Sequence, residues 1–161
     1  MATKTIQQWF DEYAESHQNH TNKLIHWICI PAIFFSIVCL LSLVPVAGVL
    51  NLAGVIMLFA TLFYARLSPK LAVGMVLFYA LCFLGAKWLG AWSIPLWISA
   101  LIIFVVAWIG QFIGHHIEGK KPSFVKDLRF LLIGPAWLMG FVYKWLGLGI
   151  KVPLDSKKTW H

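Results

Sequence analysis

One stretch constrains the fold of this chain more than any other, because it runs from Leu24 to Ala65 without an Asp, Glu, Lys or Arg. A helix needs about 20 consecutive apolar residues to cross a bilayer, so the stretch has room for two such helices. Pro45 lies in its middle and favours a break there, since proline removes a helical hydrogen bond. Two further apolar runs follow. The predicted membrane spans cover residues 24–43, 46–65, 71–88 and 94–113.

The composition supports a membrane protein, since 60% of the residues are hydrophobic and only 12% are charged. Soluble domains have about 45–50% apolar and about 25% charged residues. We therefore expect an all-α fold, an integral membrane helical bundle of about four transmembrane helices with interfacial or re-entrant helices at both ends. A single membrane domain covers residues 1–161, with an interfacial helix in 1–20, spans in 24–113, and a cytoplasmic-face loop with re-entrant helices in 114–150.

The net charge of +7 comes from Lys and Arg residues placed between the apolar runs. This placement suits membrane orientation and anionic headgroups, so we expect membrane lipid and no nucleic acid as a partner. The positive residues predict that the N-terminus, the second loop and the segment after the fourth span are cytoplasmic. The expected membrane is the bacterial inner membrane, or the endoplasmic reticulum in a eukaryote. Nothing in the sequence indicates an oligomeric state.

Two amphipathic segments flank the spans. Ile6, Trp9, Phe10 and Tyr13 recur at helical spacing and predict an N-terminal interfacial helix, whose apolar face His17 continues. In the polar run that follows, the sequence predicts a helix break, with a side chain capping the first span. The two candidates for this N-cap are Thr21 and Asn22.

After the fourth span, Phe124, Leu128, Leu131 and Leu132 predict a second interfacial helix. We expect the pair at 134–135, Gly-Pro, to break this helix. The apolar segment 136–146 is short and contains a lysine, which favours a re-entrant or surface-lying helix over a fifth span.

Five histidines form two clusters that are far apart in the sequence. Span counting brings both clusters to the same membrane surface, because the first span begins and the fourth ends there. Neutral imidazole is a common ligand of divalent metals, so the convergence points to a metal site. The alternative is that these side chains only make hydrogen bonds near the headgroups. The five are His17, His20, His26, His115 and His116.

Two long motifs, in residues 13–31 and 108–122, followed by the Gly-Pro pair at 134–135, resemble a family of small multi-spanning membrane proteins. The family was first described as a domain of unknown function, and it includes a fungal 2-hydroxy fatty acid dioxygenase of phytosphingosine α-oxidation. The resemblance covers nearly the whole chain. It implies an Fe(II)-dependent dioxygenase that uses dioxygen to shorten a long-chain 2-hydroxy fatty acid by one carbon.

The resemblance and the predicted histidine site together suggest roles for individual residues. The histidines of the family match His17, His26 and His115, which are the candidate metal ligands, whereas His20 and His116 match less well. Candidates to orient a ligand imidazole are Asn22, Gln111 and Glu118, and candidates to offset the charge of the substrate carboxylate are Lys120 and Lys121. Two alternatives stay open. One is another metal-dependent lipid enzyme, such as a zinc hydrolase, and the other is a non-catalytic membrane protein that binds lipid or a partner.

Overall fold

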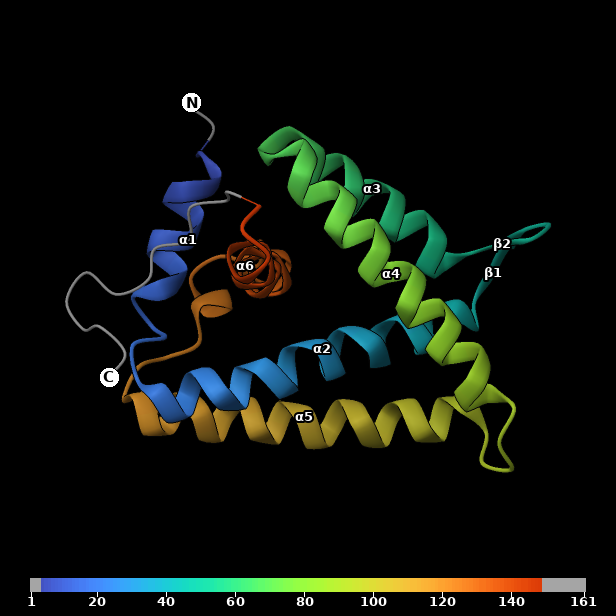
Figure 1. Ribbon diagram of the computed structural model, residues 1–161. Coiled ribbons are helices and arrows are strands. Elements are labelled where there is room, and N and C mark those ends of the chain that lie inside the picture. The colour runs from blue at the N-terminus through green and yellow to red at the C-terminus, as the bar shows by residue number, and fades with distance from the viewer. Residues whose placement is uncertain (1–3, 149–161) are drawn as a thin grey trace.

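The computed structural model describes residues 4–148, so residues 1–3 and 149–161 of the expected domain lie outside it. The described chain is mostly helical, and Figure 1 shows α2 and α5 lying antiparallel along their length. The elements are α1 (Ile6–Ala14), α2 (His20–Ser42), β1 (Pro45–Ala47), β2 (Leu50–Asn51), α3 (Leu52–Leu67), α4 (Pro69–Gly90), α5 (Leu96–Glu118), η1 (Ser123–Val125) and α6 (Phe130–Trp145).

Three helices of the described chain, α2, α4 and α5, are long and apolar enough to cross a membrane. They correspond to the first, third and fourth predicted spans. The second predicted span corresponds to α3, which has only 16 residues. The count of four spans stays a prediction, while the mostly helical class is confirmed.

A small β-hairpin shortens α3 at its N-terminal end. Strands β1 and β2 pair antiparallel, with Pro45 opposite Asn51, where the sequence predicted a helix from residue 46. Gly48 has φ +56°, a left-handed conformation that glycine adopts without steric cost. The side chain of Asn51 then caps α3 by accepting a hydrogen bond from the N–H of Gly54 at 3.0 Å. A turn and a cap therefore begin α3 later than hydropathy alone suggests.

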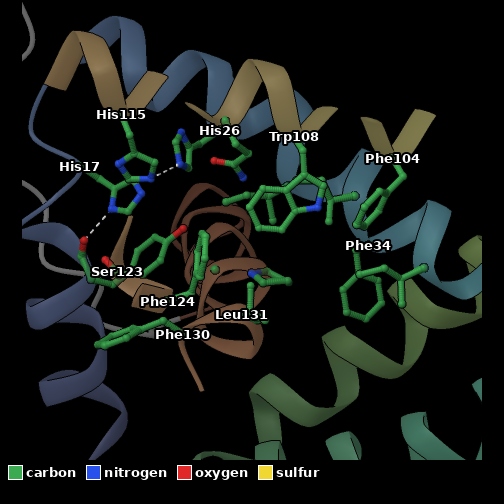
Figure 2. A pocket seen from close by; sticks show the side chains of 17 residues that line it. His17, His26, Phe34, Phe104, Trp108, His115, Ser123, Phe124, Phe130 and Leu131 are labelled. Carbon is green, nitrogen blue, oxygen red and sulfur yellow. Dashed lines mark hydrogen bonds between the residues drawn. The ribbon is translucent and has the colours of Figure 1, made fainter. Parts of the chain in front are cut away.

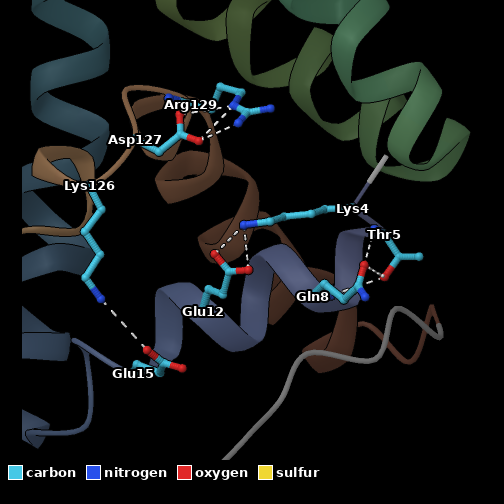
Figure 3. Close-up of polar contacts among 8 residues, drawn as sticks. All are labelled: Lys4, Thr5, Gln8, Glu12, Glu15, Lys126, Asp127 and Arg129. Atoms are coloured by element: carbon cyan, nitrogen blue, oxygen red, sulfur yellow. Dashed lines mark hydrogen bonds and ion pairs between the residues drawn. The ribbon is translucent and has the colours of Figure 1, made fainter. Parts of the chain in front are cut away.

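Helix α1 confirms the predicted amphipathic pattern. Trp9, Phe10 and Tyr13 are buried against α6, where Trp9 meets Phe130 edge to face at 5.2 Å between ring centroids. The opposite face carries polar contacts (Figure 3), including the exposed ion pair of Lys4 with Glu12 at 2.7 Å. Exposed pairs of this kind contribute little to stability, so apolar burial holds α1 in place.

The N-cap of α2 differs from the two predicted candidates. The side chain of Asn19 accepts hydrogen bonds from the N–H groups of Thr21 at 2.9 Å and Asn22 at 3.3 Å, so α2 begins at His20. The prediction of Thr21 or Asn22 was therefore wrong by two to three residues. The carbonyl and side chain of Asn22 are instead used elsewhere, as described below.

The C-terminal segment also corrects the prediction. The first part of the interfacial helix expected over 124–132 is a single 3₁₀ turn, η1. Helix α6 then begins at Phe130 and continues through the Gly-Pro pair. Gly134 packs tightly, because a Cβ there would lie 3.1 Å from the hydroxyl of Tyr13. Small residues therefore let α6 approach α1, and this packing compensates for the hydrogen bond that Pro135 cannot donate. Figure 1 views α6 nearly end-on, across the direction of α2 and α5.

Two glycines on α5 set its contact with α2. A Cβ at Gly110 would collide with the thiol of Cys29, and a Cβ at Gly114 would collide with the side chain of Asn22. Residues four apart lie on one helix face, and small residues at this spacing let two helices approach closely. The close contact brings the N-terminal end of α2 against the C-terminal end of α5, where His26 and His115 lie.

Candidate metal centre

Three histidines from separate elements meet inside the bundle. His17 lies in the loop between α1 and α2, His26 on α2 and His115 on α5, and their candidate ligand atoms all lie within 4.8 Å of one another. The side chains are 1%, 1% and 7% exposed. The prediction that the two histidine clusters converge is confirmed for these three residues.

The ring of His17 is held by the end of α1. Its Nδ1–H donates to the carbonyl of Tyr13 at 2.6 Å, and the phenol ring of Tyr13 stacks on the imidazole at 4.0 Å between centroids. Because Nδ1 donates, Nε2 carries a lone pair. This Nε2 is buried and has no hydrogen-bond partner among the described residues. It faces the other two imidazoles with its lone pair available.

His26 is oriented in the same manner. Its Nδ1–H donates to the backbone carbonyl of Asn22 at 2.9 Å, which leaves Nε2 free to coordinate. That Nε2 lies 3.2 Å from Nε2 of His115. Two imidazole nitrogens, each about 2.1 Å from one shared ion, are separated by about 3 Å. The spacing therefore fits two ligands of a single metal.

The electrostatic setting also fits a cation. Burial, together with the neighbouring His26, lowers the pKa of His17 from 6.5 to about 2, so the ring is neutral at neutral pH. Neutral imidazole is the form that binds metal. Within the described residues, the cluster consists of histidines alone, without a carboxylate or thiolate ligand.

The histidines form one end of a cavity of about 250 Å³ (Figure 2). Its other walls are mostly apolar and aromatic, with Trp108 between the histidines and the rings of Phe34 and Phe104 at the opposite end. Gln111, 9% exposed, adds an amide to the lining. An apolar cavity with polar groups at one end suits a molecule with a polar head and a hydrocarbon tail.

Glu118, the last residue of α5, ties the histidine loop to the bundle. Its carboxylate accepts hydrogen bonds from the N–H groups of Gln18 and Asn19, both at 2.8 Å. It also accepts one from the side-chain amide of Asn22 at 3.0 Å. Because amide donors occupy its oxygens, Glu118 is part of the framework that holds the loop of His17.

Four other predicted residues lie away from the cavity. The ammonium group of Lys120 donates to the backbone carbonyl of Glu15 at 2.6 Å, and Lys121 is exposed. His20 and His116 are also exposed and lie outside the three-histidine cluster. The structure therefore brings together His17, His26, His115 and Gln111 around the cavity, with Asn22 behind His26.

Sequence reasoning missed two polar residues near the site. The hydroxyl groups of Ser16 and Ser123 share a hydrogen bond of 2.5 Å, and Ser123 lines the cavity. Ser16 also lies 3.5 Å from Nδ1 of His17. Tyr13 was predicted as part of an apolar stripe and as the start of the first motif, without a role at the site, yet it lines the cavity too. No periodic pattern marks the serines, because their contact joins residues 107 positions apart.

Comparison with known proteins gave two matches. The family model described as 2-hydroxy-palmitic acid dioxygenase Mpo1-like matches residues 3–146. The 2-hydroxy-palmitic acid dioxygenase MPO1 of Saccharomyces cerevisiae is 30% identical over 135 residues, which cover 82% of this chain and 76% of the yeast protein. No solved structure matches the chain.

Proposed function

The chain belongs to the Mpo1-like family, and on that premise we propose that it is a dioxygenase that shortens 2-hydroxy fatty acids by one carbon. The observation that carries the proposal is the meeting of three buried histidines at one end of an apolar cavity. The yeast relative, a 2-hydroxy-palmitic acid dioxygenase, supplies the substrate class. The cavity supports it, because a 2-hydroxy fatty acid has a polar head and a long apolar tail.

In this proposal His17, His26 and His115 hold Fe(II). The unpartnered Nε2 of His17 and the close approach of His26 to His115 support one shared ion. Three imidazoles also suit zinc, but zinc has no redox chemistry. Bound Fe(II) supplies the redox chemistry that lets dioxygen react with the substrate. Three protein ligands leave positions open for exogenous ligands.

The residues of the chain bind and orient the substrate. The carboxylate and the 2-hydroxyl group lie at the histidine end, where Gln111 and Ser123 offer neutral hydrogen-bonding groups. The tail lies along Ile30, Ile33 and Trp108 and excludes water from the reacting end. The carbonyls of Tyr13 and Asn22 keep the imidazoles in the tautomer whose Nε2 points inward, as such partners do in known metal sites.

The overall reaction balances with dioxygen as the sole oxidant. The bond between the carboxyl carbon and C2 breaks, and C2 is oxidised to the carboxyl group of the shortened acid. The lost carbon leaves as carbon dioxide, and the remaining hydrogen and oxygen leave as water. No reductant or second organic acid is required, which distinguishes this reaction from one that consumes a 2-oxo acid.

We further propose that the site lies at the cytoplasmic face of the bacterial inner membrane, or of the endoplasmic reticulum in a eukaryote. Helices α2, α4 and α5 have the length and apolarity of membrane spans. The site lies where α2 begins and α5 ends, beside Lys23 and Lys120. An excess of positive residues marks the cytoplasmic side of membrane proteins.

The proposal is tested with protein purified without oxygen, loaded with Fe(II) and supplied with 2-hydroxy-palmitic acid and dioxygen. We expect an acid one carbon shorter, with carbon dioxide and water as the other products. Iron should be present at one ion per chain, and zinc-loaded protein should be inactive. The variant His115→Ala should lose both metal and activity, while His116→Ala, changed at the exposed neighbour, should keep both. Full activity with zinc, or metal content unchanged in His115→Ala, would contradict the proposal.

A further inference from the structure

We infer that Phe34 and Phe104 close the far end of the cavity and thereby set the length of the acyl chain that the site accepts. The inference rests on the proposed function for the identity of the ligand, a saturated straight-chain 2-hydroxy acid. It assigns a role to two residues that have no contact with the metal centre.

The cavity runs from the three histidines toward the rings of Phe34 and Phe104. Its polar groups gather at the histidine end, and its lining along α5 runs from His115 through Gln111 and Trp108 to Phe104. The lining along α2 runs in parallel from His26 to Phe34 and Ile37. His115 and Phe104 are eleven residues apart, which is about 16 Å at the helical rise of 1.5 Å per residue. A chain anchored by its carboxylate at the histidines therefore extends toward the two rings (Figure 2).

Neighbouring aromatic rings support the far end of the cavity, where Phe34 and Phe104 lie. The ring of Phe34 stacks on Tyr79 at 5.3 Å between centroids and 8° between planes, and it also meets Phe78 at 5.3 Å. Both partners belong to α4, so a helix lies behind Phe34. The ring of Phe104 packs against Trp108 at 6.0 Å. A supported aromatic wall resists displacement by extra methylene groups, because protein interiors are close-packed.

The acyl chain has an alternative path past Ile37. Ile37, which also lines this end, is 37% exposed, so the cavity lining reaches the surface of the bundle beside the two rings. If the acyl chain leaves the cavity beside Ile37, the rings of Phe34 and Phe104 do not limit its length. The two arrangements make opposite predictions for variants of Phe34 and Phe104.

The neighbouring residues provide matched controls. Phe35 follows Phe34 on α2 but contacts Gly85 of α4 instead of the cavity. Phe112 lies on α5 with 54% of its surface exposed and does not line the cavity. Substitutions at these two positions remove the same aromatic ring from the same helices without enlarging the cavity.

The experiment uses the full-length protein in lipid nanodiscs. It measures kcat/KM and binding affinity for a series of saturated 2-hydroxy acids of increasing acyl-chain length. We expect Phe34→Leu and Phe104→Ala to move the optimum to longer chains, with a gain of about fourfold for each added methylene that the enlarged cavity accommodates. Ile33→Phe, which adds a ring to the cavity wall one residue before Phe34, should move the optimum to shorter chains. Phe35→Leu and Phe112→Ala should keep the wild-type profile.

The outcomes separate the inference from the proposed function. An unchanged optimum in the cavity variants, or an equal change in the controls, overturns the inference. A protein that turns over none of the acids overturns the proposed function. In that case a shift in the length dependence of binding still supports the assignment of the two rings, and its absence overturns that assignment too.

Discussion

At the scale of single residues, two of the three histidines, His17 and His26, depend on backbone carbonyls for their orientation. Tyr13 and Asn22 each accept the Nδ1–H of the histidine four residues later, so both Nε2 atoms point inward. The sequence predicted the histidines, because their residue type and clustering are visible in it. The carbonyl partners were not predictable, because every residue has a carbonyl and only the fold selects which one accepts.

The carboxylate of Glu118 should be required for the metal site although it is not a ligand. Glu118→Gln replaces an acceptor oxygen with an NH₂ group among three N–H donors, which leaves at least one donor unpaired. We expect metal affinity to fall by about 10- to 100-fold, measured by chelator competition.

The matched control for that variant is Glu12→Gln. Glu12 lies on the exposed face of α1, where it forms an ion pair with Lys4. It should leave metal affinity unchanged. Wild-type affinity in Glu118→Gln would show that the loop of His17 is held without its carboxylate.

Acid should destabilise the metal-free protein through His17. Burial lowers its pKa from 6.5 to about 2, so below pH 6.5 the unfolded chain binds a proton that the folded chain excludes. The free energy of unfolding is therefore unaffected by His17 well above pH 6.5, and it falls as the pH decreases toward 2. At one pH unit below 6.5, proton binding by His17 in the unfolded chain lowers the free energy of unfolding by about 1.4 kcal/mol.

The measurement is chemical unfolding of the metal-free protein in detergent over this pH range. His17→Gln, which has no titrating ring, should show a shallower loss than the wild type. Identical pH profiles for the two proteins would mean that the imidazole of His17 is solvated in solution.

At the scale of elements, the contact between α2 and α5 sets the distance between His26 and His115. We expect Gly114→Ala to separate the helices, because the new Cβ collides with the side chain of Asn22, which is itself bonded to Glu118. Metal affinity should fall by about tenfold or more. The melting temperature should fall with it.

Gly54→Ala serves as the control for helix propensity. A Cβ at Gly54 meets only the side chain of Asn51, at an ordinary 3.7 Å, and α3 is remote from the histidines. Alanine is a better helix former than glycine, so this variant should be neutral or slightly more stable. Equal loss of metal in both variants would rule out a specific role for the close contact.

Hydropathy identified the long helices well but misjudged the segments at their ends. Residues 24–43, 71–88 and 94–113 were predicted as helical spans, and α2, α4 and α5 contain nearly all of them. The sequence patterns placed the start of α3 too early, and they predicted a break at the Gly-Pro pair through which α6 continues. A Gly-Pro pair usually ends a helix in isolation, but the packing of Gly134 against Tyr13 stabilises the continuous helix.

At the scale of the whole molecule, orientation in the membrane is the main prediction. We expect Lys121→Cys to react with a membrane-impermeant maleimide only from the cytoplasmic side, and Trp92→Cys only from the opposite side. The physical reason is the excess of Lys and Arg at the end that holds the site.

The measurement uses sealed vesicles of both orientations. The native Cys29, Cys39 and Cys82 lie within long apolar helices, and an unsubstituted chain measures their background. Labelling of both variants from the same side would contradict a membrane crossing by α5, which joins the two labelled positions. Labelling with reversed sidedness would move the site to the other face.

The mostly helical character, the long apolar helices and the convergence of distant histidines follow from the order of residues alone, because hydropathy and span parity depend on nothing else. Tertiary structure decided which three of five histidines meet, how Glu118 and the backbone carbonyls hold them, and where the apolar cavity ends. Those features depend on the rotation and spacing of packed helices, which small residues such as Gly114 and Gly134 set through contacts between distant parts of the chain.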